Sequence, residues 1–224
     1  DANLTGDYRL EFELPGAETA AEGIQRPGES WRDWRDFQRV LLRFDGVESI
    51  GLVHLNGKRV GVVRGSRLRT ELDVTDLLRP GRNLLHVRVH QWSAMTYVED
   101  QDQWWLPGIF RSVCLIGRPA GGIDDFWLDA GYDHRTGRGR IVPEITAADD
   151  AWPITLRIDD LHFEQTFASA DELLPLDLGE VVAWDCDTPR LYTATLASNG
   201  DTIEAKIGFR TVRVVGRELL VNGR

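Results

Sequence analysis

A short acidic and aromatic segment, residues 97–111, contains the side chains whose types and spacing are best suited to chemistry. Its polar and aromatic members include Glu99, Asp100, Asp102, Trp104 and Trp105. Carboxylate oxygens accept hydrogen bonds from hydroxyl groups, and flat apolar rings cover the face of a sugar. The segment therefore predicts a carbohydrate-contacting loop.

The three carboxylates do not form a catalytic pair by themselves. A glycosidase that uses two carboxyl groups needs an acid and a nucleophile or base at a fixed separation across the sugar. Glu99, Asp100 and Asp102 are too close in sequence to bracket a pyranose ring unless the loop folds unusually. An acidic loop is also commonly a solvated surface. The ligand-binding and the surface interpretations therefore both stay open on these residues alone.

Three other motifs favour structural roles. His86 and His90 would suit a metal on a helix, but residues 87–89 are typical of a strand, which would place the two rings ~13 Å apart. Ser66 lacks the second glycine of a nucleophile elbow and is expected to be a loop hydroxyl. Residues 137–139 lack the strand and helix around a phosphate-binding loop and predict a hairpin turn.

The composition is ordinary for a soluble globular protein and argues against two kinds of partner. Hydrophobic residues make up 42% and charged residues 28% of the chain. The net charge of -10 argues against nucleic acid and against an anionic membrane, since both need clustered lysine and arginine. No apolar run approaches the ~20 residues of a membrane span.

The two cysteines, Cys114 and Cys186, are far apart in sequence and are expected to be buried free thiols in different domains. This usage fits a reducing compartment, so we expect a cytoplasmic location. The chain begins at Asp1 and ends in an apparent turn at residues 222–224. Both ends are therefore expected to be truncated, so the lack of a targeting signal says nothing about where the native protein is located.

The first half of the chain predicts short strands separated by turns. Residues 8–14 alternate apolar and polar side chains, which is typical of a half-buried strand. A polar loop over residues 15–36 follows. Asn56-Gly57 between two β-rich runs predicts a tight hairpin, because both residues tolerate positive φ. Residues 75–79 predict a single helical turn capped by Thr75. The other expected strands are residues 37–44, 50–55, 59–63, 70–74, 83–90 and 109–116.

The stretch from Arg118 to Gly122 predicts a domain boundary, and a second set of strands follows it. This spacing is typical of an immunoglobulin-like sandwich, which has about seven short strands. The expected strands are residues 126–132, 138–145, 154–158, 162–167, 192–197 and 202–209. Residues 219–224 predict a strand that enters another Asn-Gly hairpin whose partner strand is missing.

Three tryptophans outside the acidic segment are expected to pack rather than to bind sugar. Trp31 and Trp34 are expected to pack onto a sheet or a neighbouring domain, with sugar stacking as the alternative. Trp184 is expected to pack the second sandwich.

The acidic segment resembles, almost residue for residue, the motif YLEDQDMWRMSGIFR of the β-galactosidases of glycoside hydrolase family 2. This form of the motif differs from that of the β-glucuronidases and β-mannosidases. Weaker resemblances extend over nearly the whole chain, at residues 3–9, 44–49, 53–61, 65–68, 71–75, 80–83, 87–89, 184–192, 208–210 and 220–223.

The resemblance implies an all-β fold in two parts. A jelly-roll-like sugar-binding sandwich would occupy residues 1–118, with its amino-terminal strands missing, and an immunoglobulin-like β-sandwich would occupy residues 119–212. Residues 213–224 would be the start of a (β/α)₈ barrel that this chain does not contain.

The resemblance also implies which residues matter. Both catalytic glutamates would lie in the barrel, so no residue here is expected to be catalytic. Asp102 would bind galactose hydroxyls and help to hold a sodium ion, since its two oxygens can accept hydrogen bonds and neutralise a cation. Glu99, Asp100, Trp104 and Arg111 would support the loop. No cofactor is expected in the chain itself, whereas sodium and magnesium are expected in the full-length parent.

The departures from the family's pattern are Leu4, Arg69 and Pro107, and Pro107 is expected to stiffen its turn. The missing first strands would leave an unpaired edge, which invites self-association. The expected partners are therefore a β-galactoside substrate, the barrel domain and a homo-oligomer.

Two hypotheses follow for function. In the favoured one, the chain is the non-catalytic amino-terminal part of a retaining β-galactosidase that hydrolyses terminal non-reducing β-D-galactose residues, and it is inactive alone. In the alternative, it is a freestanding carbohydrate-binding module. A further alternative is a parent enzyme of the same family that acts on another β-glycoside.

Overall fold

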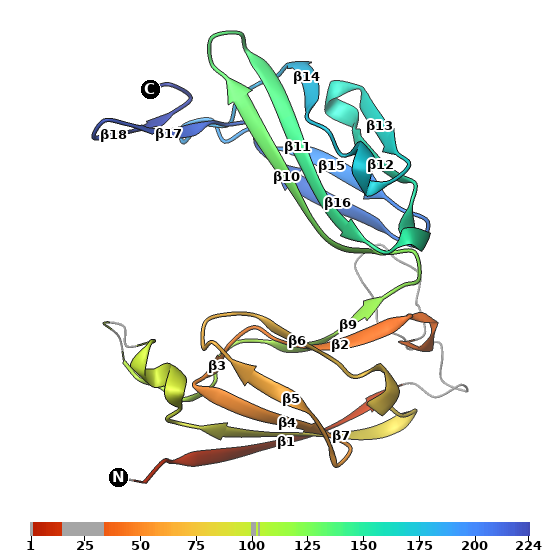
Figure 1. The fold of residues 1–224 in the computed structure, drawn as a ribbon, viewed down its shortest axis with the longest axis vertical. Helices are drawn as coiled ribbons and strands as arrows, with labels where there is room; N and C mark the ends of the chain where they lie inside the picture. The colour runs from red at the N-terminus through yellow and green to blue at the C-terminus, as the bar shows by residue number, and fades with distance from the viewer. Residues whose placement is uncertain (1, 15–33, 100–101, 103) are drawn as a thin grey trace. The chain divides into compact units, whose positions relative to one another are not determined.

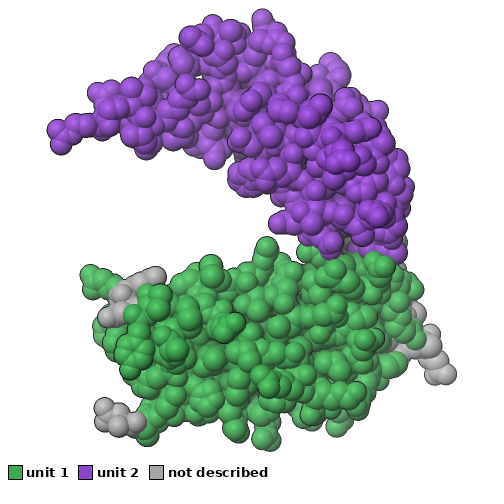
Figure 2. Space-filling model, in the orientation of Figure 1, with its two compact units in different colours: residues 1–118 green, residues 119–224 purple. Residues whose placement is uncertain are grey.

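The computed structural model describes residues 2–14, 34–99, 102 and 104–224. These residues form an all-β protein, as the sequence predicts, with strands joined by turns and short 3₁₀ helices (Figure 1). The chain divides into two compact units, Asp1–Arg118 and Pro119–Arg224 (Figure 2). None of the helices in the described part of the chain has the length and apolar character needed to cross a membrane.

The larger sheet of the first unit has four antiparallel strands in the order β1-β7-β4-β5. Their bounds are β1 Thr5–Leu14, β7 Gly81–His90, β4 Ile50–Leu55 and β5 Lys58–Arg64. Strand β7 alternates buried and exposed side chains, with Leu85, Val87 and Val89 facing inward. One face of the sheet therefore packs on the core and the other faces solvent.

A second sheet, in the order β6-β2-β9, supplies the opposite wall of the same core. Its strands are β6 Thr70–Asp73, β2 Arg39–Phe44 and β9 Val113–Arg118. Val40, Leu42 and Phe44 of β2 join Val53 and Val87 of the first sheet in one buried cluster. Contact between the two inner faces is the arrangement of a β-sandwich.

The predicted Asn56-Gly57 hairpin joins β4 and β5, and its prediction is confirmed. Asn56 has φ 53° and Gly57 has φ 79°, the left-handed conformation that a two-residue turn of this type requires. The side chain of Asn56 also donates to the carbonyl of Leu77 and to Oδ1 of Asn83. Asn56 therefore connects the hairpin to the start of β7.

Two local predictions in this unit are wrong. Residues 109–116 form two strands, β8 Gly108–Ile109 and β9, because β8 pairs with β3, Val47–Glu48, whereas β9 pairs with β2. The helical turn is a 3₁₀ helix, η3 Thr75–Leu77, that Thr75 does not cap. Instead the carboxylate of Asp73 accepts from the backbone N–H and the hydroxyl of Thr75.

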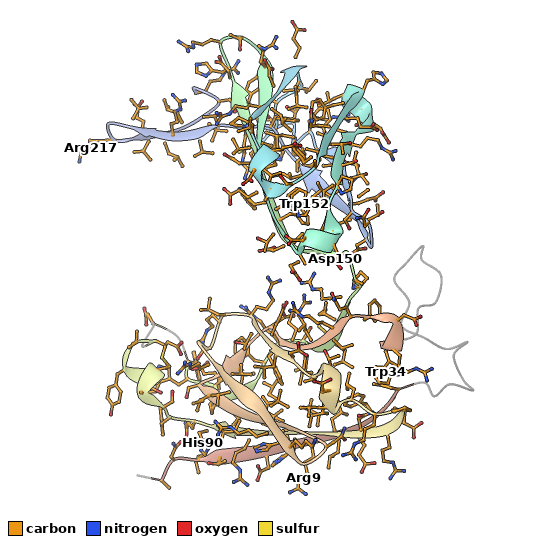
Figure 3. All side chains as sticks on the ribbon, turned by 45° about the vertical axis from the view of Figure 1, so that its right-hand side comes forward. Arg9, Trp34, His90, Asp150, Trp152 and Arg217 are labelled. Carbon is orange, nitrogen blue, oxygen red and sulfur yellow. The ribbon has the colours of Figure 1, made fainter. Side chains whose placement is uncertain are left out.

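The predicted structural roles of the histidines and of Trp34 agree with the fold. His86 bonds to Asp7 at 2.9 Å and His90 to Thr5 at 2.9 Å, both across the β1–β7 pair. No group of three potential metal-binding side chains occurs among the residues that the structure describes. Trp34 lies in the 3₁₀ helix η2, Trp34–Asp36, and joins the core (Figure 3). Trp31 lies outside the described residues.

The second unit is also built from two sheets around one core. One sheet has the order β10-β11-β14, with bounds Ile123–Asp133, Arg138–Ala147 and Leu176–Glu180. The other has the order β13-β12-β15-β16, with bounds Phe163–Phe167, Ile154–Ile158, Tyr192–Ala197 and Thr202–Ile207. Leu128 and Ile141 of the first sheet meet Leu156 and Leu196 of the second in a buried cluster. Strand β14 was not predicted from the sequence.

The hydroxyl of Tyr192 ties the start of β15 to an earlier part of the second unit. It accepts a hydrogen bond from the backbone N–H of Val182, and the ring meets Phe209 edge-on at 5.3 Å. A tyrosine that bonds back to the upstream backbone is a recurring feature of immunoglobulin-like sandwiches. Trp184 is half-buried here, with the guanidinium of Arg210 5.2 Å from its ring.

The end of the chain forms the predicted strand and Asn-Gly turn. Strand β18, Glu218–Val221, enters a turn at Asn222, with φ 52°, and Gly223, with φ 81°. The sequence did not predict that β18 also pairs with the preceding strand β17, Val212–Val215. Gly216 at φ 63° makes the tight connection between them. The Asn222 side chain then accepts from the backbone N–H of Thr211 and donates to the carbonyl of Trp184.

The cysteine prediction is half right. Cys114 and Cys186 are free thiols, as expected, and they lie in different units. Neither cysteine is buried, however: Cys114 is half-buried, and Cys186 is exposed because it lies in the turn between Asp185 and Thr188.

Candidate functional site

The connection from β7 to β8 within the first unit, residues 91–107, contains the three carboxylates and the two tryptophans of the acidic segment. We call it the acidic loop. It begins with a 3₁₀ helix, η4 Ala94–Tyr97, whose first turn is capped by Ser93. The Ser93 hydroxyl accepts from the N–H of Met95, and the Thr96 hydroxyl accepts from the N–H of Ser93. Because these bonds satisfy the free N–H groups of the first turn, they define how the chain leaves β7.

Glu99 is held to the body of the unit by Ser66. The hydroxyl of Ser66 donates to Oε2 of Glu99 at 2.5 Å, and only 2% of Ser66 is exposed. Ser66 lies in the turn between β5 and β6, far from Glu99 in sequence. The backbone N–H of Glu99 also donates to the carbonyl of Met95 at 2.8 Å. One oxygen of Glu99 is therefore already bonded within the unit, and Glu99 acts as an anchor of the loop.

The other end of the loop is defined by a glycine in a tight position. Gly108 has φ 137°, a conformation that side chains disfavour, and a Cβ there would lie 2.8 Å from the hydroxyl of Tyr8. Gly108 pairs with Glu48 in the short β3–β8 ladder. Glycine at position 108 therefore lets the loop return to the sandwich without strain.

Phe110 and Arg111 fasten the segment that follows. Two guanidinium groups contact the Phe110 ring, that of Arg67 at 5.4 Å and that of Arg111 at 5.3 Å from the ring centroid. Arg111 donates to the carbonyls of Asp45 and Arg67, and Arg67 forms an ion pair with Glu48 at 2.9 Å. These contacts give Arg111 a clear means of supporting the loop.

The two tryptophans of the loop have different surroundings. Trp105 meets Trp92 edge-on, with 5.1 Å between ring centroids, whereas Trp104 is 85% exposed. Trp105 therefore has an aromatic partner in the described part of the chain, whereas the loop support expected of Trp104 stays a prediction. Sequence reasoning did not separate the two indoles, because adjacent residues give no signal of which one packs.

Next to this pair of indoles is an open pocket of about 390 Å³. Its lining combines aromatic rings and hydroxyl groups, from Trp92, Ser93, Thr96, Tyr97 and Trp105. A pocket of this size with a few polar groups is within the range of small-ligand sites. Sequence reasoning missed Trp92, Ser93 and Thr96, and the capping pattern at Ser93 is the local signal that could have shown where the chain turns.

Asp102 is the open carboxylate of the loop. Its side chain is exposed and has no hydrogen bond or ion pair within the described ranges. Asp100 lies outside the described residues. One carboxylate alone does not complete a site for a hard cation, which takes several oxygen ligands, so further ligands for a sodium ion at Asp102 would have to come from elsewhere.

Comparison with known proteins shows the family of this chain. Residues 5–119, which include the acidic loop, match the family described as "Glycosyl hydrolases family 2, sugar binding domain". The first unit is thus a sugar-binding β domain by class. The whole chain belongs to glycosyl hydrolase family 2.

The similar proteins carry names from the same family of enzymes. A β-galactosidase of Arthrobacter sp. (strain B7) is 48% identical over the whole of this chain, which covers 20% of that protein. A β-galactosidase large subunit of Latilactobacillus sakei is 34% identical over 84% of this chain and 32% of its own length. The chain therefore spans about a fifth to a third of these relatives.

Solved structures agree on the fold. A β-glucuronidase from Ruminococcus gnavus superposes on 100% of this chain and 38% of its own, with a TM-score of 0.77 and 23% identity. One from an uncultured Clostridium covers 97% of this chain and 37% of its own, with a TM-score of 0.75 and 24% identity. At this identity the likeness concerns the fold alone.

Proposed function

We propose that this chain is the part of a retaining β-galactosidase that presents Asp102 to the substrate, and that the catalytic carboxylates lie elsewhere in the parent enzyme. The single observation that carries the proposal is the contrast between Glu99, which Ser66 occupies, and Asp102, which is open. The 48% identity to a β-galactosidase of which the chain covers 20% supports both the activity and the idea of a larger parent.

The geometry is suited to binding rather than to bond cleavage. An ionised carboxylate accepts two or more hydroxyl hydrogen bonds, so Asp102 would accept from galactose hydroxyls. Glu99 and Gly108, which flank Asp102 in sequence, are each held to the body of the first unit. If sodium is bound in the parent, Asp102 would supply one of its oxygen ligands and neutralise part of its charge.

Among the residues that the structure describes, none bonds to Asp102 in a way that would activate it as an acid or a nucleophile. We therefore expect no hydrolysis by the chain alone. The assay is turnover of a nitrophenyl galactoside by the pure chain, and measurable turnover that survives repurification would overturn this expectation.

The role of Asp102 is tested in the full-length parent. Replacement Asp102→Asn keeps the size of the side chain but removes the charge, and it should lower kcat/KM for galactosides by about 10²-fold or more if two hydroxyl hydrogen bonds to a charged group are weakened, at ~1.5–3 kcal/mol each. The matched control is Asp187→Asn in the second unit. Equal activity of the two variants would refute the role.

Substrate choice is tested with the same parent. Nitrophenyl galactoside, glucuronide and mannoside are compared by kcat/KM, and we expect preference for the galactoside. A parent that prefers either of the others would keep the family assignment and reject the galactose specificity.

A second function is favoured by one observation, the pocket beside Trp92 and Trp105. Such a pocket could bind a sugar without any further domain, as in a freestanding carbohydrate-binding module. Titration of the chain with galactose separates the two: we expect weak binding, because the contacts of the rest of the site are not in this chain. Tight binding that Asp102→Ala abolishes would favour the module.

A further inference from the structure

Strand β1 forms one edge of the larger sheet of the first unit, and its outer side has no partner strand among the described residues. It is ten residues long and pairs only with β7. Most of its residues are exposed. A long strand with an unpaired outer side is a template for pairing with another chain.

The register shows which backbone groups point outward. Leu4, just before β1, accepts from the N–H of Gln91, so the even-numbered residues of this segment turn their N–H and C=O groups toward β7. In an antiparallel pair alternate residues point in opposite directions, so the odd-numbered residues turn their backbone N–H and C=O groups away from β7. The outward residues are Thr5, Asp7, Arg9, Glu11 and Glu13.

The inward side chains of β1 are incompletely covered. Tyr8 is 43% and Leu10 58% exposed, although the residues paired with them, Val87 and Leu85, are buried. Phe12 and Leu14, further along the strand, join the core. The core-facing side of β1 is therefore apolar but open near Tyr8 and Leu10.

We propose that a second copy of this chain pairs with β1 in an antiparallel, two-fold symmetric manner centred on Tyr8. The outward residues can bond only to one another, so the two-fold axis must pass through a residue of the strand. An axis at Tyr8 sets Asp7 opposite Arg9 of the second copy, twice. An axis at Arg9 would set Asp7 opposite Glu11, twice. An axis at Leu10 would set Arg9 opposite Glu11 but also Asp7 opposite Glu13, each twice, so that attraction and repulsion offset each other. Like charges directly opposite each other are destabilising, so charge complementarity selects Tyr8.

The side chains agree with this register. Asp7 accepts from Arg88 at 2.9 and 3.0 Å and bonds His86 at 2.9 Å, and a carboxylate has about four acceptor positions, so one remains for Arg9 of the second copy. On the other face, Gly6 would lie opposite Leu10, which leaves room for the leucine. Tyr8 would meet its own copy across the axis. The two four-stranded sheets would then form one continuous sheet.

The association is tested by sedimentation velocity of the chain over a range of concentrations. We expect a reversible dimer, whose share rises with concentration. Arg9→Pro removes an outward N–H while leaving the bonds to β7, and proline is tolerated at a strand edge of this kind. Arg9→Glu replaces each Asp7–Arg9 attraction with a repulsion. In both variants the dissociation constant of the dimer should rise at least tenfold. Figure 3 labels Arg9 on the first unit.

The matched control is Arg59→Glu on β5, the opposite edge of the same sheet, which carries the same charge change and should leave the dimer intact. A chain that is monomeric at every concentration, or an Arg9→Pro variant that dimerises as well as the parent chain while keeping its circular dichroism spectrum, would overturn the proposal.

The register is tested by disulfide formation in a Cys186→Ser background, since Cys186 is exposed. Tyr8→Cys would face its own copy across a non-hydrogen-bonded pair, at about 4.5 Å between Cα atoms, which suits a disulfide. Leu10→Cys would lie four residues, ~13 Å, from its copy. We expect cross-linked dimer only for Tyr8→Cys under mild oxidation. Cross-linking of Leu10→Cys instead would reject the axis at Tyr8.

Discussion

Replacement of Ser66 by alanine tests the anchor of the acidic loop most directly. Ser66 is 2% exposed and donates to Glu99 at 2.5 Å. A hydrogen bond to a charged group is worth ~1.5–3 kcal/mol, and the lower end applies because Glu99 is half-buried and water can replace the hydroxyl. We therefore expect Ser66→Ala to lower the free energy of unfolding of the first unit by about 1.5 kcal/mol.

Urea unfolding followed by tryptophan fluorescence measures this change. The matched control is Ser112→Ala in the same unit, because Ser112 is exposed and its hydroxyl has no hydrogen bond in the described part of the chain. It should change the free energy of unfolding by less than about 0.5 kcal/mol. A double-mutant cycle with Glu99→Ala should show a coupling of about 1 kcal/mol between the two side chains.

Two results would refute the reasoning. If Ser66→Ala and Ser112→Ala have the same free energy of unfolding, the hydrogen bond from Ser66 to Glu99 does not stabilise the first unit. If the cycle shows no coupling, the effect of Ser66→Ala comes from its own packing and not from Glu99. In either case the explanation of why Asp102, rather than Glu99, is free to contact substrate would lose its support.

The remaining predictions concern the frame of the first unit. Gly108→Ala forces a side chain into φ 137° against Tyr8 and should cost ~1–3 kcal/mol in urea unfolding, whereas Gly57→Ala, with open space around it, should cost less. Asn83→Ala should cost about 3 kcal/mol, because Asn83 is fully buried and its loss leaves the N–H of Arg79 and the amide of Asn56 unpaired, and Asn3→Ala on the exposed rim should cost clearly less. The hydroxyl of Thr75 holds the pKa of Asp73 below its usual range. The unfolded chain therefore takes up this proton at higher pH than the folded one, so the contribution of Asp73 is present above about pH 4 and is lost as the pH falls through its folded pKa. Asp73→Asn should flatten the pH dependence of urea unfolding below about pH 4 relative to the parent chain, and an unchanged slope would contradict the assignment.

Local sequence patterns predicted most of the fold because they act over a few residues. The alternation in β7 and the Asn56-Gly57 turn follow from side-chain period and backbone freedom, which need no distant partner. Residues 109–116 look like one strand for the same reason. Their division into β8 and β9 depends on two different partner strands, which local pattern does not show.

Thr75 shows the same limit in a smaller feature. A threonine before a helical turn is a common cap, yet here Val74 is the N-cap residue and no side chain caps the turn. The Thr75 hydroxyl instead donates to Asp73 and accepts from the backbone N–H of Val40. This role of Thr75 depends on β2 lying alongside, a contact between residues 35 positions apart.

The sequence alone determined that the chain is all-β, that a boundary follows Arg118, and that one segment combines carboxylates with tryptophans. Only the tertiary structure decided how these side chains differ. Glu99 is occupied because the turn at Ser66 reaches it across the sandwich, Trp105 packs because Trp92 lies beside it, and Asp102 is left open. The physical reason is that each of these contacts joins residues brought together by strand pairing, so their distance in space does not follow from their distance along the chain.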